Sequence, residues 1–159
     1  MSKQSAVERA ARAAADFGDA ADAVRQAAAA RLGLNRTDFR ILTSLRTGEP
    51  ASAGVLAATA GLSPAATTEA VQRLVARGLL RRGTDPRDRR RAVITITPGA
   101  AAELAALFGP VSDEGHRLLH GYTTAELELL IGFLEKGRRL QLAGAERMRT
   151  GRPARASAR

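Results

Sequence analysis

A basic hairpin near the middle of the chain constrains the fold more than any other feature. Residues 78–97 contain two short strand-like runs on either side of a loop rich in Asp, Pro and Arg. The second run, residues 92–97, is rich in β-branched side chains, which favour an extended backbone. Asp85-Pro86 indicates a turn between the runs. Alternation along the second run places Val93, Thr95 and Thr97 on one face and Ile94 and Ile96 on the other.

The hairpin lies in a strongly cationic stretch. From Arg73 to Arg91 there are eight Arg and two Asp residues, a net charge of +6. The whole chain carries a formal charge of +9, and Lys occurs only at Lys3 and Lys136. This balance favours a polyanionic partner such as DNA, RNA or an anionic membrane surface. The excess of Arg over Lys has two equally simple explanations. Arg can form two parallel hydrogen bonds with a phosphate or a guanine, and the chain has a compositional bias toward Arg and Ala.

The composition excludes several classes of site. Cysteine is absent, which excludes disulfides, thiolate metal sites and cysteine redox chemistry. Aromatic residues make up only 3%, so a stacking platform for single-stranded nucleic acid is disfavoured. No Ser-His-Asp pattern, phosphate loop or metalloprotease motif occurs, so no enzyme is expected. Without a membrane-spanning run or a signal segment, a cytoplasmic protein with no membrane partner is expected.

Four helices are predicted before the hairpin. The first is rich in Ala and has a stripe of small apolar residues, which fits either a surface helix or close packing on a second subunit. Ser63-Pro64 is a strong start signal for the fourth. The predicted bounds are residues 5–30, 37–46, 52–60 and 64–77. The residues expected to face the core are Val55, Leu56 and Ala60 in the third helix and Thr67, Ala70, Val71 and Leu74 in the fourth.

Two helical regions are predicted after the hairpin. The first covers residues 100–120, and Gly109-Pro110 should break or kink it. The second begins after Thr123 or Thr124, with Glu126 near the positive end of the helix dipole. Apolar residues of this last helix form one face at helical spacing. They are Leu127, Leu130, Ile131, Leu134 and Leu142.

The third and fourth helices have the spacing of a helix-turn-helix. Ala57 lets the two helices approach, Gly61 makes the turn, and the β-branched Thr67 packs behind it. This match is weak alone, but a basic hairpin directly after it is specific for a winged helix-turn-helix. The predicted fold is therefore mainly α with a small β-wing.

The stretch from the helix-turn-helix to the end of the hairpin also carries a family pattern. It includes Arg77-Gly78-Leu79-Leu80, the loop Asp85-Pro86-Arg87-Asp88-Arg89-Arg90 and a closing strand followed by Pro98-Gly99. With these motifs, residues 34–102 resemble the MarR family of bacterial transcription regulators. The Asp-x-Arg of the family's wing corresponds to Asp88 and Arg90. Three residues depart from the family pattern: Thr67, Glu69 and Ala70.

The resemblance implies a homodimer that regulates transcription, as a ligand-responsive repressor or an activator, from a palindromic operator in double-stranded DNA. The N- and C-terminal helices of the two subunits would form the dimerisation body. The DNA-binding lobe of each subunit would place one recognition helix and one wing on DNA. The corresponding segments are an N-terminal dimerisation helix (1–33), a winged helix-turn-helix DNA-binding domain (34–98), C-terminal dimerisation helices (99–150) and a disordered basic tail (151–159).

The outer side of the fourth helix is the candidate recognition surface, because an α-helix fits the major groove. Thr68 and Gln72 can form hydrogen bonds with bases, and Arg73 is suited to a phosphate. Glu69 could accept from a cytosine amino group, although nearby phosphates would repel it. For any single position, a solvated helix face is the alternative. The candidate residues are Ser63, Ala65, Ala66, Thr68, Glu69, Gln72 and Arg73.

In the wing, Arg90 is expected to enter the minor groove, where negative potential is concentrated. Asp88 would pair with Arg90 or with the wing backbone and fix its direction. Phosphate contacts are expected from Arg87, Arg89 and Arg91. The alternative is a solvated run of charges on an exposed hairpin.

The resemblance further implies a small effector, often aromatic or anionic, between the dimerisation body and the DNA-binding lobe. Candidate lining residues are Phe17, Phe39, Leu42 and His116, of which core packing explains the apolar three better. No other cofactor is expected.

The two histidines of the chain, His116 and His120, share a helix face and could bind a metal with Asp113 or Glu114. A strong third ligand is not evident, so no metal site is predicted. Two alternative functions stay open: a metal-responsive regulator that uses this histidine pair, and a basic nucleoid-type protein that binds DNA without sequence preference.

Overall fold

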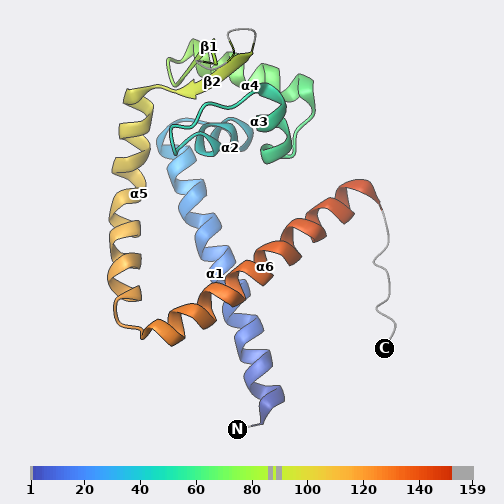
Figure 1. Cartoon of the computed structure of the whole chain (residues 1–159), viewed down its shortest axis with the longest axis vertical. Helices are drawn as coiled ribbons and strands as arrows, with labels where there is room; N and C mark the ends of the chain where they lie inside the picture. The colour runs from blue at the N-terminus through green and yellow to red at the C-terminus, as the bar shows by residue number, and fades with distance from the viewer. Residues whose placement is uncertain (1, 86–87, 89–90, 152–159) are drawn as a thin grey trace. The chain divides into compact units, whose positions relative to one another are not determined.

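The computed structural model describes residues 2–85, 88 and 91–151 (Figure 1). These residues form a mainly α-helical fold with one small antiparallel hairpin, as predicted. The elements are α1 (Lys3–Arg31), α2 (Arg36–Ser44), α3 (Ala53–Ala60), α4 (Pro64–Ala76), β1 (Leu80–Thr84), β2 (Ala92–Ile96), α5 (Pro98–Leu119) and α6 (Thr124–Thr150). Their contacts divide the chain into two units, Met1–Gly109 and Pro110–Arg159.

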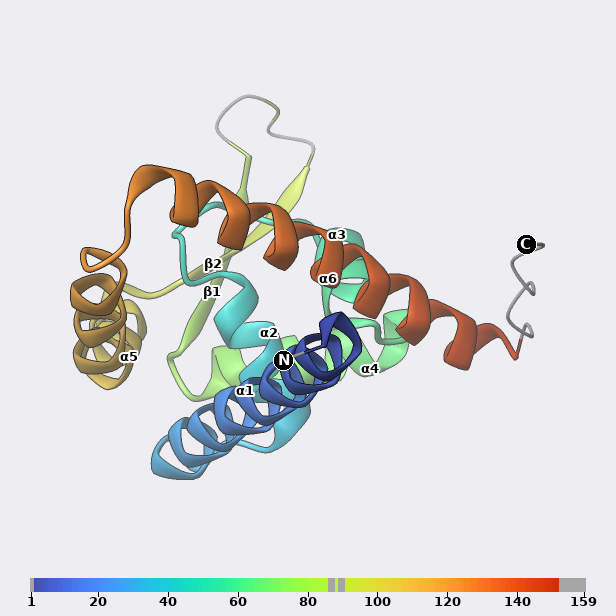
Figure 2. The ribbon, with the colours of Figure 1, turned by 90° about the horizontal axis from the view of Figure 1, so that it is seen from below.

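Within the first unit, α2, α3, α4 and the hairpin gather at the C-terminal end of α1 (Figures 1 and 2). They enclose one apolar cluster, to which the end of α1 and the start of α5 also contribute. Phe39 and Phe108 meet at its edge, with ring centroids 6.3 Å apart. The most deeply buried large side chains of the cluster are Ile41, Leu42, Leu45, Leu56, Val71, Leu74 and Leu80.

The helix-turn-helix is formed by α3 and α4. Gly61 ends α3 with φ +61°, a left-handed backbone conformation that glycine adopts without steric cost. The Ser63 hydroxyl then accepts from the backbone N–H of Ala66, and Pro64 occupies the first position of α4, which confirms the predicted start. All four residues expected on the inner side of α4 are buried.

One predicted core residue of α3 is wrong. Leu56 and Ala60 are buried, but the Val55 side chain is 53% exposed. Residues four apart share a helix face, so Leu56 and Ala60 define the inward side, whereas Val55 points about 100° away from Leu56.

The hairpin pairs Leu80 with Ile96 and Thr84 with Ala92. Ile94 and Ile96 belong to the apolar cluster; Val93, predicted on the opposite face, is also buried but lies outside that cluster. The other edge of β2 pairs with Ala51, which exchanges two backbone hydrogen bonds with Ile94, of 2.8 and 3.0 Å. The base of the hairpin is therefore held on both edges of β2.

We predicted a break or a kink at Gly109-Pro110, and the break is wrong because α5 continues through Pro110. Proline has no backbone N–H, so the carbonyl of Ala106 lacks its usual donor, while the helix continues on both sides. The contact division nevertheless falls at this point, between Gly109 and Pro110.

In the second unit, α6 begins with a reciprocal capping arrangement. The Glu126 backbone N–H donates to the Thr123 hydroxyl, and the Thr123 N–H donates to the Glu126 carboxylate at 2.8 Å. The Thr123 N–H, and to a lesser extent the Thr123 hydroxyl, which also donates to the Glu126 carboxylate at 2.7 Å, lower the pKa of Glu126 below its ordinary value. No residue of α6 is buried.

Candidate nucleic-acid interface

Helix α4 presents a mixed polar surface on the side away from the core. Ala66 is half-buried, and the other candidate recognition residues are exposed: Ser63, Ala65, Thr68, Glu69, Gln72 and Arg73. The Thr68 hydroxyl donates to the Pro64 carbonyl at 2.9 Å. Its hydrogen is thus used within the helix, so Thr68 offers an acceptor rather than a donor to an approaching base. Gln72 can both donate and accept, which suits adenine.

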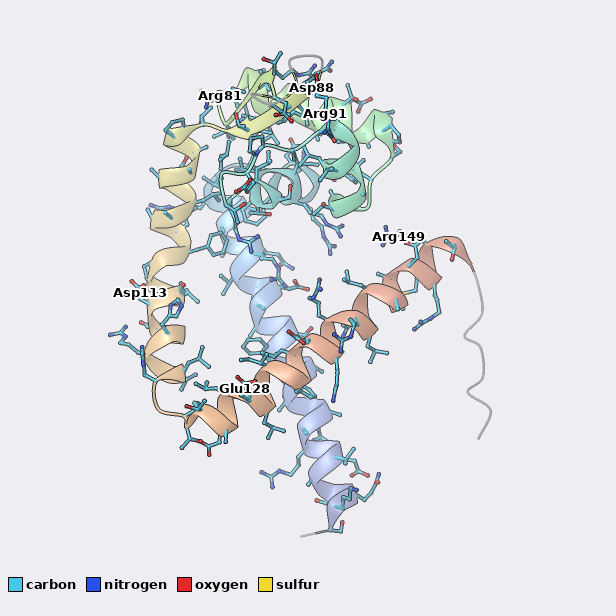
Figure 3. The ribbon with its side chains drawn as sticks, viewed as in Figure 1. Arg81, Asp88, Arg91, Asp113, Glu128 and Arg149 are labelled. Atoms are coloured by element: carbon cyan, nitrogen blue, oxygen red, sulfur yellow. The ribbon has the colours of Figure 1, made fainter. Side chains whose placement is uncertain are left out.

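The described part of the hairpin is cationic and exposed. Arg81, Arg82 and Arg91 are all exposed, and Figure 3 labels Arg81, Asp88 and Arg91 at the hairpin. Arg81 donates from Nε to the Thr95 hydroxyl at 3.0 Å, across the strand pair, so its side chain follows the sheet. Sequence reasoning gave no role to Arg81 and Arg82. The sequence did hold a signal for them. They follow Leu80 in a strand that is polar from Arg81 onward, which indicates exposed, cationic side chains.

Backbone hydrogen bonds shape the described part of the wing loop. The Asp85 N–H donates to the Arg91 carbonyl at 2.9 Å, and the Arg91 N–H donates to the Asp88 carbonyl at 2.9 Å. The Asp88 N–H in turn donates to the Asp85 carbonyl at 3.2 Å. The other predicted wing contacts, Arg87, Arg89 and Arg90, lie outside the described residues, and so does the predicted pairing of Asp88 with Arg90.

Arg73 forms a forked ion pair with Asp38 of α2. Nε donates to one carboxylate oxygen at 3.0 Å and Nη2 to the other at 2.6 Å. The hydrogen bond to Asp38 raises the pKa of Arg73 above its ordinary value. The Asp38 side chain is only 6% exposed, against 46% for Arg73. The phosphate contact expected of Arg73 therefore has to share a guanidinium group that already binds protein.

Sequence reasoning missed Asp38, although a signal was present. Asp38 precedes Ile41, Leu42 and Leu45 at helical spacing, so it lies on the apolar stripe of α2. A carboxylate in such a stripe is rarely buried without a cationic partner. The sequence alone does not show which of the many arginines is that partner.

Arg77, which follows α4, also binds protein. Nη1 donates to the Gly33 carbonyl at 2.8 Å and Nη2 to the Leu32 carbonyl at 2.7 Å. Both acceptors lie at the C-terminal end of α1, where carbonyls lack helical donors and the dipole favours a cation.

A cavity of about 550 Å³ lies between α1 and α2. Its lining residues are Asp22, Arg25, Gln26, Ala29, Ala30, Leu34, Arg36, Phe39, Arg40 and Thr43. Of the residues predicted to line a ligand site, Phe39 is here, whereas Leu42 is in the core and Phe17 is 71% exposed on α1. His116 belongs to the second unit.

The histidine pair on α5 is exposed. Within residues 2–85, 88 and 91–151, no three His, Cys, Asp or Glu side chains come together as a group that could hold a metal ion. Among the helices in the same residues, none is long and apolar enough to cross a membrane.

Comparison with known proteins identifies the fold and the family. A family model described as MarR family matches residues 32–91. The HTH-type transcriptional regulator YcgE of Bacillus subtilis (strain 168) is 37% identical over 124 residues, which cover 78% of this chain and 80% of that protein.

Solved structures of other transcriptional regulators have a similar fold. The transcriptional regulator BldR of Sulfolobus solfataricus is 27% identical, with a TM-score of 0.54, and the match covers 87% of this chain and 99% of that one. Apo MarR of E. coli shares the fold at 24% identity, with a TM-score of 0.54 over 79% of this chain and 94% of that one. The chain, in which α4 has an exposed polar side and the hairpin is cationic, belongs to the MarR family of DNA-binding transcriptional regulators.

Proposed function

We propose that the protein is a homodimeric, ligand-responsive repressor that binds a palindromic operator in double-stranded DNA. The observation that carries this proposal is the exposed polar side of α4 beside a cationic hairpin, both on one apolar cluster. A helix of this kind fits the major groove, and cations beside it suit the flanking phosphates.

In this proposal, α4 reads bases and the wing supplies most of the charge. Gln72 and Thr68 contact base edges from the exposed side of the helix. Arg82 and Arg91 contact phosphates, together with Arg87 and Arg89. Arg90 enters the minor groove beside the site that α4 occupies.

The homodimer is supported by exposed apolar side chains that are not part of the apolar cluster. On α6, Leu129 is 75% exposed, Phe133 is 53% exposed and Leu140 is 67% exposed. On α1, Phe17 is 71% exposed. Apolar residues at this density on a helix without buried residues call for a covering surface, and a second copy of the chain supplies one.

The effector is proposed to bind the cavity between α1 and α2. Its volume of about 550 Å³ lies within the range of small-molecule sites. Phe39 offers an aromatic surface, and Arg36 and Arg40 offer cationic groups. A third lining arginine, Arg25, is paired with Asp22 at 2.6 Å. This chemistry fits a small aromatic anion. Benzoate should bind with measurable heat in calorimetry and neutral benzamide should not; equal binding of both would contradict an anion site.

Selection of bound sequences from a random duplex pool tests the DNA-binding proposal. We expect an enriched palindrome whose half-sites are about one helical turn apart, or a multiple of it. No enrichment would favour the basic nucleoid-type alternative, and a single unpaired half-site would contradict the dimer. Repression is then tested by transcription in vitro from a promoter that contains the selected palindrome.

A further inference from the structure

Two arginines one turn apart, Arg73 within α4 and Arg77 just after it, donate hydrogen bonds to acceptors of the same chain. Arg73 binds the Asp38 carboxylate through Nε and Nη2, at 3.0 and 2.6 Å. Arg77 binds the carbonyls of Leu32 and Gly33, at 2.7 and 2.8 Å. All four acceptor atoms lie within residues 32–38, which include the junction between α1 and α2 and the first turn of α2.

Both sets of hydrogen bonds, from Arg73 and from Arg77, have a preferred geometry. Asp38 is nearly buried, so its carboxylate needs a partner, and a forked pair fixes the guanidinium plane as well as its distance. The carbonyls of Leu32 and Gly33 are at the end of α1, where a cation is favoured. The hydrogen bonds of Arg73 and Arg77 therefore favour one position of α4 and one rotation of α4 about its axis.

Apolar packing fixes the position and the rotation of α4 less strictly than these hydrogen bonds do. Hydrophobic attraction has no direction, and the inner side of α4 includes the small residues Thr67 and Ala70 beside Val71 and Leu74. A small rotation of α4 would keep most of that burial but would move Thr68 and Gln72 away from the bases that they contact.

We infer that Arg73 and Arg77 are positioning residues, which hold α4 on the α1–α2 junction at the orientation that base discrimination requires. The inference rests on the proposed operator-specific function. It differs from the simpler view of both residues as phosphate contacts, in which their charge alone would matter.

The substitution Asp38→Asn separates the two views, because it removes a negative charge without changing any DNA-facing residue. If charge alone matters, the variant should bind every duplex as tightly as the wild type or more tightly. If Asp38 positions α4 through Arg73, affinity for the selected palindrome should fall about tenfold, while affinity for a scrambled duplex is kept or rises.

A second variant covers the case in which Asp38→Asn does not fold. Arg77→Gln breaks hydrogen bonds to neutral carbonyls, so it leaves no buried charge unpaired. Its matched control is Arg31→Gln, which removes one positive charge from the exposed last turn of α1. We expect both variants to bind scrambled duplex equally, and Arg77→Gln alone to lose about tenfold in preference for the palindrome.

The outcomes distinguish the inference from the function on which it rests. A wild-type protein that does not prefer any palindrome overturns the proposed function and this inference with it. A wild type that discriminates, with the same preference kept in folded Asp38→Asn and Arg77→Gln, overturns the inference alone. Circular dichroism and thermal unfolding of each variant establish that it is folded.

Discussion

Arg73 and Arg77, in and just after α4, differ from Arg82 and Arg91 of the hairpin in what their side chains bind. On α4 and at its end, Arg73 and Arg77 bind acceptors of the same chain. On the hairpin, Arg82 and Arg91 are exposed side chains of a narrow element held at its base. In the proposed DNA complex, positive charge would therefore have two separate uses. One would fix the orientation of α4, and the other would provide sequence-independent attraction to DNA.

The largest expected effect tests whether α4 depends on the core. Leu74→Ala removes a side chain with no exposed surface from the inner side of α4. It should lower the free energy of unfolding by about 2–5 kcal/mol, measured by urea denaturation. The control Val55→Ala shortens a half-exposed side chain of α3 and should change stability by less than about 0.5 kcal/mol. Equal losses would contradict the distinction between the two sides of the helix-turn-helix.

The next effect tests base reading by α4. Gln72→Ala removes a side chain that can contact adenine with two hydrogen bonds, so it should cost about 1–3 kcal/mol of discrimination at one position in each half-site. The measurement is a set of affinities for the selected palindrome and its single-base variants. A uniform loss across all these duplexes would instead assign Gln72 to the sequence-independent contacts.

A smaller effect is expected from the wing. Arg91→Gln should weaken binding to palindrome and scrambled duplex by the same factor and reduce the slope of log affinity against log salt by about one. Fluorescence anisotropy over a range of salt concentrations measures both quantities. Arg82→Gln, in strand β1, is the companion variant. If either substitution changes base preference with an unaltered slope, the division of roles between helix and wing is wrong.

The smallest effect concerns the exposed hydrogen bonds between Thr123 and Glu126 at the start of α6, which is distant in sequence from α4 and from the hairpin. The pKa of Glu126 is lowered in the folded protein, so its ionised form contributes stability that is present above the ordinary value of 4.5 and is lost as pH falls through the lowered pKa. Helicity should therefore decline slightly on acidification. In Glu126→Gln, which keeps the capping geometry without an ionisable group, this contribution to the pH dependence should disappear. An unchanged profile would show that the cap carries no such linkage.

Local signals predicted much of the fold. Ser63-Pro64 located the start of α4 because a capping hydroxyl followed by proline acts within one turn. The inner side of α4 followed from helical spacing. Val55 was misplaced because α3 is apolar around most of its circumference, so periodicity does not single out one face.

Long-range pairings were not predictable in the same way. Asp38 and Arg73 are 35 residues apart, and Arg77 meets carbonyls 44 and 45 residues earlier in the chain. No spacing rule selects these partners, because they meet only once the helices pack. The same reason explains why Phe39 could be proposed for a ligand site while the arginines around it were not.

The hydrogen bonds between Ala51 and Ile94 have a consequence for how the wing can vary. With β2 paired on both edges, the register of the hairpin is set at its base, and a one-residue slip would turn Ile94 and Ile96 out of the core. In the proposed DNA complex, a change in the number of residues between Thr84 and Ala92 would then alter how far the wing reaches across DNA, while the pairing of Ala51 with Ile94 would keep the register of β2. The reach of the wing and the base contacts of α4 would be two separate targets for protein engineering.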